Sequence, residues 1–275
     1  MKSRRALSFF TLSGVSLVAG ALLGATAASP AESVLTVQPG DPLVNGTVIQ
    51  PYQNKWKLVG RGSDGSKVEM GTWTDVARIA QVDGREVIFR RQIWIHDRGA
   101  EGYVNVVDHK TLAPILSQYT NAGGLYRRIE FSEDGRTARY QCTPSLDPEP
   151  KPGSRPPIAA PMLGGEVKLN RPLFDFNTGM FGLLILGFPL KEGYAARFPV
   201  FRSYDPKSEP AWVDFEVKGR EKVPAKPGTM LDTWLVVAHS PDTNEVMTFN
   251  LVQAPPYIIR LRQEWQGRDW TFEMM

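Results

Sequence analysis

The side chains best suited to nucleophilic or acid–base chemistry are scarce in this chain, which has three histidines, His96, His109 and His239, and one cysteine, Cys142. Each histidine has a carboxylate or hydroxyl residue beside it in the sequence. Successive side chains of a strand point to opposite faces, however, so sequence neighbours do not readily form a proton relay. We expect each histidine to lie at a strand end or a turn, without a catalytic role.

No motif marks a metal site, a cofactor site or an enzyme active site. The sequence has neither a paired-histidine zinc motif nor Cys-x-x-Cys spacing, and no Gly-x-Ser-x-Gly nucleophile elbow. Gly60-Arg61-Gly62 runs into the turn-like Ser63-Asp64-Gly65 rather than into a helix, which argues against a phosphate-cradling loop. The sequence therefore predicts no metal, no cofactor and no catalytic residue. A secreted hydrolase with a dispersed, motif-free site is an alternative.

A single cysteine excludes an intramolecular disulfide, so the stability of the fold must come from a hydrophobic core. Cys142 ends the alternating run Tyr140-Gln141-Cys142 and has no partner motif. This position is typical of a half-buried cysteine in a strand rather than of a nucleophile.

The N-terminus has the order of a secretory signal peptide. A basic start with Lys2, Arg4 and Arg5 precedes an uncharged stretch over residues 6–24 and a small-residue run over residues 25–28. We predict cleavage after Ala27, which gives a signal peptide (1–27), an N-terminal segment of the β domain (28–81) and the main β domain (82–275). The apolar stretch is too dilute for a membrane-spanning helix, so we expect cleavage and no membrane span after it. An uncleaved N-terminal anchor is the alternative. The paired arginines leave the twin-arginine and general secretory routes both open, and either route predicts a periplasmic protein.

The charge balance argues against nucleic acid as a partner. The chain has 32 basic and 29 acidic residues, and removal of Lys2, Arg4 and Arg5 with the signal peptide leaves 29 of each. Binding through phosphate contacts and counterion release needs a basic surface, and no run of five or more Lys and Arg residues supplies one.

Short alternating runs separated by turn residues predict a mainly β protein. In residues 86–95 the odd-numbered positions are apolar except for Arg91, and the even-numbered positions are mixed. Similar runs occupy residues 103–107, 115–120, 125–131, 137–142, 196–204, 211–218, 231–239, 245–252, 257–264 and 270–274. Asp83-Gly84 and Asp134-Gly135 are typical hairpin turns. Strand follows strand without a helical crossover, so we expect an antiparallel sheet.

Residues 178–186 are the helix candidate, with Asn177 or Thr178 as the N-cap. The segment is apolar nearly all round, so it must be buried or must face an apolar ligand. A buried strand is the alternative, because Gly179 and Gly182 would each cost a helix about 1 kcal/mol.

Residues 144–161 contain seven prolines, which deny the backbone its donors and fix its φ angles. We predict a long surface connection. Since long loops often carry function, a lid over a ligand site is the alternative.

Several segments resemble, in their order and spacing, a family of bacterial periplasmic proteins of unknown function. They are the run over residues 106–114, Phe174-Asp175, Gly187-Phe188-Pro189-Leu190, Glu192-Gly193-Tyr194, the run over residues 217–224, Lys226-Pro227-Gly228-Thr229 and the run over residues 255–260. Together they span residues 82–262. The family looks related to lipoprotein-carrier domains, which implies a strongly curved antiparallel sheet, an incomplete barrel, closed by one buried helix in a single domain. It implies no catalytic residues.

The predicted function follows from this resemblance and from the apolar helix. We expect an exported protein that binds a lipid or other hydrophobic small molecule without catalysis, between the curved sheet and the helix. The candidate ligand-binding residues are Met180, Phe181, Leu184, Leu186 and Trp234. The alternative is a structural or interaction protein of the cell envelope, whose sheet is filled by its own side chains and whose edge contacts a protein partner.

Overall fold

The computed structural model describes residues 34–61, 65–143, 162–175, 180–202, 209–226 and 228–275. The predicted signal peptide and the proline-rich segment 144–161 both lie outside these residues. Within the described residues, no helix has the length and apolar character needed to cross a membrane.

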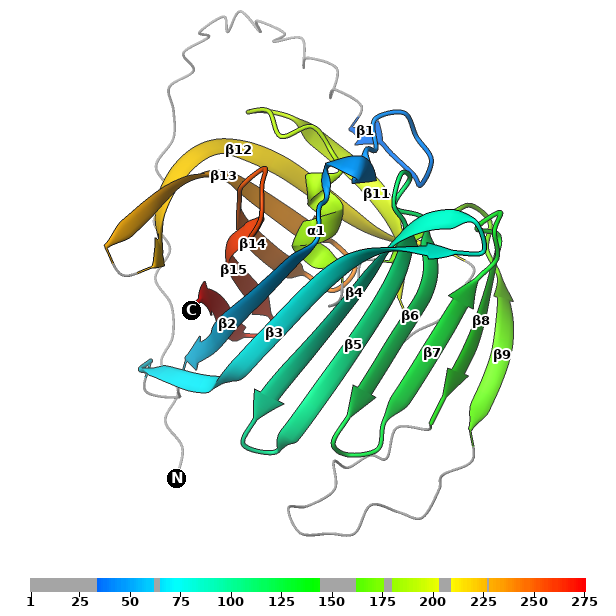
Figure 1. Ribbon diagram of the computed structural model, residues 1–275, viewed down its shortest axis with the longest axis horizontal. Helices are drawn as coiled ribbons and strands as arrows, with labels where there is room; N and C mark the ends of the chain where they lie inside the picture. Colours follow the sequence, from blue (N-terminus) through cyan, green and yellow to red (C-terminus); the bar gives the residue numbers. More distant parts are fainter. Residues whose placement is uncertain (1–33, 62–64, 144–161, 176–179, 203–208, 227) are drawn as a thin grey trace, which may run out of the picture. The chain divides into compact units, whose positions relative to one another are not determined.

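One curved sheet of 16 strands forms the fold (Figure 1). The strands are β1 (Leu35–Thr36), β2 (Tyr52–Arg61), β3 (Lys67–Val82), β4 (Arg85–His96), β5 (Gly99–Asp108), β6 (Pro114–Asn121), β7 (Tyr126–Phe131), β8 (Thr137–Cys142), β9 (Leu163–Lys168), β10 (Phe174–Asp175), β11 (Ala195–Phe201), β12 (Ala211–Lys226), β13 (Thr229–Ser240), β14 (Glu245–Leu251), β15 (Ile258–Trp265) and β16 (Arg268–Met274). Two helical turns accompany them, η1 (Gly46–Val48) and α1 (Phe181–Leu186).

The spatial order of the strands is β1-β11-β12-β13-β14-β15-β16-β2-β3-β4-β5-β6-β7-β8-β9, with β10 beside β11. The pairs that β11 makes with β1 and β10 are parallel, and the other pairs are antiparallel. β1 and β9 end the order without pairing with each other, so the sheet is an incomplete barrel. The predicted fold class is therefore confirmed.

Strand positions in the predicted runs agree with the structure, but two long strands were not predicted. β2 and β3 lie in the middle of the sheet and join β16, the last strand of the chain, to β4. In β2 buried and exposed residues alternate from Tyr52 to Trp56, with their apolar members facing the core. This alternation was the signal that could have identified the strand.

The helix α1 begins at Phe181, and Met180 is its N-cap without a side-chain capping bond. The predicted N-caps Asn177 and Thr178 lie outside the described residues. Gly182 permits a close approach of α1 to the sheet, because a Cβ atom there would lie 2.8 Å from Ile258 Cδ1 and 3.0 Å from Phe249 Cδ1. The glycine that weakens the helix by propensity thus allows it to pack on β14 and β15.

The inner face of β4 is the mixed face and not the more apolar one. Ile88 and Arg90 are buried there, whereas Phe89 and Ile95 on the other face are exposed. Arg90 is accommodated because its Nη2 lies 2.5 Å from Asp75 Oδ2, and both side chains are almost wholly buried. The hydroxyl of Tyr52 donates a hydrogen bond of 2.9 Å to the same carboxylate. A paired charge can occupy a core from which an unpaired one is excluded.

A long β12–β13 hairpin extends beyond the predicted strands. The sequence pattern ended this strand at Lys218, but β12 continues to Lys226. A register shift between Val217 and Gly219, where Gly219 has φ of +129°, redirects the strand without ending it. The outer half of the hairpin packs through Val223 and Ala225 against Ile259 of β15. It therefore covers part of the sheet face opposite α1.

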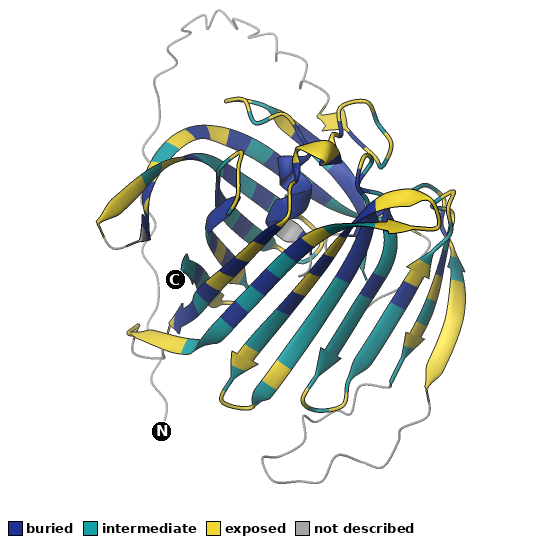
Figure 2. Cartoon of the chain, in the orientation of Figure 1, coloured by how far each residue is buried: buried dark blue, intermediate teal, exposed yellow. Residues whose placement is uncertain are grey.

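The main core encloses α1 against the inner faces of the strands, which appear as alternating dark bands in Figure 2. Its aromatic side chains pack edge to face and in stacks, as in the pairs that Phe198 makes with Phe174, Phe188 and Phe215. A smaller cluster joins Ile129 of β7 and Ala138 of β8 to Phe201 of β11. These contacts connect strands from the two halves of the sheet order.

Candidate ligand-binding site

The predicted site residues do not share one surface. Met180, Leu184 and Leu186 are 1%, 1% and 6% exposed, and they belong to the main core. Phe181 opens α1, but its side chain lies outside what the structure describes. Trp234 is partly buried on β13, and the guanidinium of Arg220 lies 4.6 Å from the centre of its ring. The core thus unites three of the residues, and Trp234 packs at its margin.

The space between α1 and the sheet is filled in this conformation. A cavity beside Gly182, walled by Trp56, Trp73 and Phe272, has a volume of only about 20 Å³. A space of this size holds about one water molecule. The cavity is too small for an acyl chain, and ligand uptake at this place would require the core to open.

An apolar groove lies instead at the C-terminal end of α1. Its volume is about 370 Å³. It is lined by Leu43, Asn45, Val48, Leu186, Gly187, Phe188, Pro189, Leu190, Gln253 and Tyr257. Leu186 is the predicted site residue that reaches this groove. Leu43 and Val48 are large apolar side chains that stay 40% and 43% exposed on its wall.

Hydrogen bonds hold the wall that η1 forms. The backbone N–H of Asn45 donates to the carbonyl of Gly187 at 2.8 Å, and that of Gly46 donates to the carbonyl of Lys110 at 3.0 Å. Gly46 is needed for this contact, because a Cβ atom would lie 2.0 Å from the His109 carbonyl oxygen. The side chain of Asn45 accepts a bond from the N–H of Thr47 and so orders the turn.

Tyr257 fixes the opposite side of the groove. Its hydroxyl accepts a hydrogen bond from the backbone N–H of Gln50 at 2.7 Å and donates one to the carbonyl of Val48 at 3.1 Å. Burial raises the pKa of this hydroxyl, and the bond from Gln50 opposes the shift. Tyr257 follows the cis peptide bond between Pro255 and Pro256 and has φ of +63°. The two hydrogen bonds of its hydroxyl join the turn before β15 to the segment of η1.

No lining residue of the groove carries a formal charge. The polar members are the amides Asn45 and Gln253 and the Tyr257 hydroxyl, and the first and last already have protein partners. Desolvating such a surface costs little compared with a charged one. The arrangement suits non-covalent binding of an apolar group, and it offers no nucleophile or metal ligand at the lining positions.

The histidines and the cysteine occupy structural positions. His96 ends β4, His109 follows β5 and is buried against Glu86 and the carbonyl of Ile49, and His239 is the penultimate residue of β13. Cys142 is half-buried at the end of β8 as a free thiol, as predicted. Among the described residues, no group of three or more His, Cys, Asp or Glu side chains is arranged to hold a metal ion.

The structure thus defines the class of protein. It is an incomplete β-barrel around a buried helix, with an uncharged groove at the end of that helix. The chain matches DUF3108, a family of proteins of unknown function, over residues 67–268 and belongs to that family. No curated protein matched.

One solved structure is similar to this chain. It is a protein of Bacteroides fragilis described as a candidate exported protein with a YmcC-like fold. The two are 7% identical, the match covers 82% of this chain and 94% of the other, and the TM-score is 0.31. A similarity of this size supports no inference about function.

Proposed function

We propose that this protein is an exported binding protein for a lipid or other amphiphile, and that the groove at the end of α1 holds the apolar part of the ligand. The observation that carries this proposal is the combination of about 370 Å³ of volume with a lining free of formal charge. The signal-peptide order of the N-terminus supports export to the periplasm. No catalytic step is part of the proposed function.

The expected affinity follows from burial alone. Each buried methylene contributes about 0.8 kcal/mol, so eight methylenes supply about 6 kcal/mol before the cost of association. Exposed Leu43 and Val48 would be covered in the complex, which adds to the apolar area removed from water. A long chain should bind detectably, and a short-chain ligand should bind weakly.

Two measurements test this proposal. The first is native mass spectrometry with organic extraction of protein purified from the periplasm without detergent, which should show a co-purifying lipid. The second is titration with N-phenyl-1-naphthylamine, an uncharged fluorescent probe. Wild-type protein that carries no lipid, even after incubation with membrane lipids, and that shows no saturable probe binding would rule out the proposal.

A matched pair of variants locates the site. Val48→Asp places a carboxylate on the groove wall and should weaken probe binding at least tenfold, because the charge must be desolvated when the ligand covers it. Val82→Asp is the control, since Val82 is equally exposed at 43% but lies at the end of β3, away from the groove lining. Equal affinities of the two variants would place the ligand elsewhere. Circular dichroism checks that both remain folded.

A second candidate function is supported by the sheet edge at β9. This strand ends the hydrogen-bonded order, and it is exposed along nearly its whole length (Figure 2). An exposed edge can accept a strand from a protein partner. Cross-linking in the native envelope, through a photoreactive residue in place of Leu163, would capture such a partner, whereas a carrier would give no specific adduct there.

A further inference from the structure

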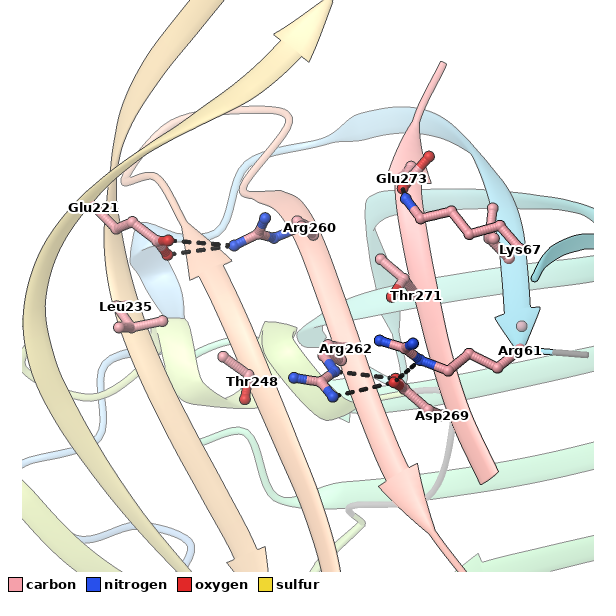
Figure 3. Close-up of a pocket in the computed structure, with 12 residues that line it drawn as sticks. Arg61, Lys67, Glu221, Leu235, Thr248, Arg260, Arg262, Asp269, Thr271 and Glu273 are labelled. Atoms are coloured by element: carbon pink, nitrogen blue, oxygen red, sulfur yellow. Dashed lines mark hydrogen bonds and ion pairs between the residues drawn. The ribbon is translucent and has the colours of Figure 1, made fainter. Parts of the chain in front are cut away.

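A charged cleft lies under the β12–β13 hairpin, on the face of β14, β15 and β16 opposite α1 (Figure 3). Its volume is about 430 Å³. The lining comprises Val59, Gly60, Arg61, Lys67, Glu221, Leu235, Thr248, Arg260, Arg262, Asp269, Thr271 and Glu273. The charged and hydroxyl residues come from six strands, β12, β14, β15, β16, β2 and β3, whose alternation brings their side chains to one face.

The hairpin makes this face a cleft rather than an open sheet surface. Its buried contact with Ile259 holds the outer half of β12 over β15, and Glu221 and Leu235 form the overhanging wall. Beneath them Arg262 of β15 pairs in register with Thr248 on one side and Thr271 on the other. A guanidinium is thus flanked by two hydroxyl groups on the floor.

Cations exceed carboxylates in the lining by four to three. Asp269 is shared: it accepts a bond of 2.9 Å from Arg61 Nε and bonds of 3.0 Å from Arg262 Nε and Nη2. Its pKa is held below its usual value, chiefly by Arg262, so it stays ionised at neutral pH. Within the described part of the chain, the bond to Asp269 is the one hydrogen bond of the Arg61 side chain, which leaves its terminal N–H groups for a ligand.

The remaining carboxylates are neutralised within the cleft. Arg260 Nη2 lies 3.3 Å from Glu221 Oε2, and Lys67 Nζ lies 3.5 Å from Glu273 Oε1. Arg262 Nη2 also lies 3.2 Å from Glu264 Oε1, just outside the lining, so Asp269 and Glu264 balance the charges of Arg61 and Arg262. What the cleft offers a ligand is therefore hydrogen-bond donors, above all the terminal N–H groups of Arg61, rather than surplus charge. Guanidinium groups match the oxygens of phosphate and carboxylate. Donors arriving from four strands, β2, β14, β15 and β16, suit a phosphoryl group, which offers more acceptor oxygens than a carboxylate.

We propose that this cleft binds a phosphoryl group, with Arg61, Arg262 and the flanking threonine hydroxyls as its donors. Two sources share this chemistry, the headgroup of an anionic phospholipid and a soluble phosphate ester. The site is independent of the apolar groove, because it lies on the other face of the sheet and its lining shares no residue with that groove.

The experiment uses the full mature chain and two kinds of probe. Calorimetric titration with glycerol 3-phosphate tests the soluble source, with acetate at the same concentration for comparison. Co-sedimentation with phosphatidylcholine vesicles, with and without phosphatidic acid, tests the lipid source. We expect saturable binding in at least one arm and no binding of acetate. Absence of binding in both arms would overturn the proposal.

Two double variants distinguish specific binding in the cleft from non-specific electrostatic attraction. Arg61→Gln combined with Arg262→Gln should weaken binding about tenfold or more, since each change removes charge-assisted hydrogen bonds. Arg85→Gln with Arg128→Gln is the control: it removes the same charge from two arginines outside the cleft lining, paired with Glu133 and Glu130. An equal loss in both double variants would mean non-specific attraction and would refute the assignment. Circular dichroism and unfolding midpoints verify the fold of each.

Discussion

Breaking the buried pair between Arg90 and Asp75 should destabilise the protein more than any change to its surface ion pairs. The two side chains are 1% and 0% exposed, and Tyr52 donates to the same carboxylate. Arg90→Met leaves a buried carboxylate without its counter-ion, and Asp75→Leu leaves a buried guanidinium without its own. Either change should cost about 3–5 kcal/mol. The double variant replaces both charges by apolar side chains and should lose less than either single variant.

Urea unfolding followed by tryptophan fluorescence measures these differences. With a slope of roughly 2–3 kcal/mol per molar, the single variants should lower the midpoint by roughly 1–2.5 M. The coupling within the double-variant cycle is the decisive quantity, because it isolates the pair from the packing changes. Two results would refute the view that the charges depend on each other. One is a loss of unfolding free energy below about 1 kcal/mol in both single variants. The other is a loss in the double variant that equals the sum of the two single losses.

Three further predictions concern packing, backbone and pH. Gly182→Ala should destabilise the fold by about 1–3 kcal/mol despite the higher helix propensity of alanine, because its Cβ would press on Ile258 and Phe249; thermal unfolding measures the loss. Gly219→Ala should cost about 1–2 kcal/mol in chemical unfolding, since φ of +129° is strained for any residue with a Cβ. Burial raises the pKa of Glu245, so its contribution to stability is fully present below the unfolded value near 4.5 and is lost as pH rises through the folded pKa. The melting temperature of Glu245→Gln relative to wild type should therefore increase between pH 4.5 and pH 8.

Sequence alternation was a reliable guide to the strands and a poor guide to which face is buried. In β4 the odd-numbered face is the more apolar one, yet Phe89 and Ile95 on it are exposed and the opposite face buries Arg90. Its partner Asp75 is on β3, and nothing local in the sequence joins the two residues. Long-range pairing therefore decided the orientation where hydrophobicity alone pointed the other way.

The extended β12 shows a second limit. Gly219 and Pro224 are residues that usually interrupt a strand, and the predicted strand ended at Lys218, just before the first of them. In the structure they lie inside β12, where the register shifts near Gly219 and Pro224 redirect the strand. The charged cleft could not be foreseen for this reason, since it exists only because the hairpin covers β15.

The apolar groove was predicted only through Leu186. Leu43 and Val48 come from a segment with no strand or helix pattern, and Tyr257 comes from the turn before β15. These residues converge through backbone hydrogen bonds between distant loops, which carry no periodic signal in the sequence. Burial of Met180 and Leu184 was one of the two outcomes expected for an apolar helix, and the core of this structure shows that outcome.

The pairing of β16 with β2 also constrains how the chain is made. Trp56 pairs with Met274, and the N–H of Met275 donates to the carbonyl of Lys55, so β2 is completed by a strand that is synthesised long after it. Until then β2 and β15 both present unpaired edges, which are prone to aggregation. Contacts of such large sequence separation form slowly. Assembly of the native sheet must therefore wait for the synthesis of β16, and the edge of β2 needs protection during that interval.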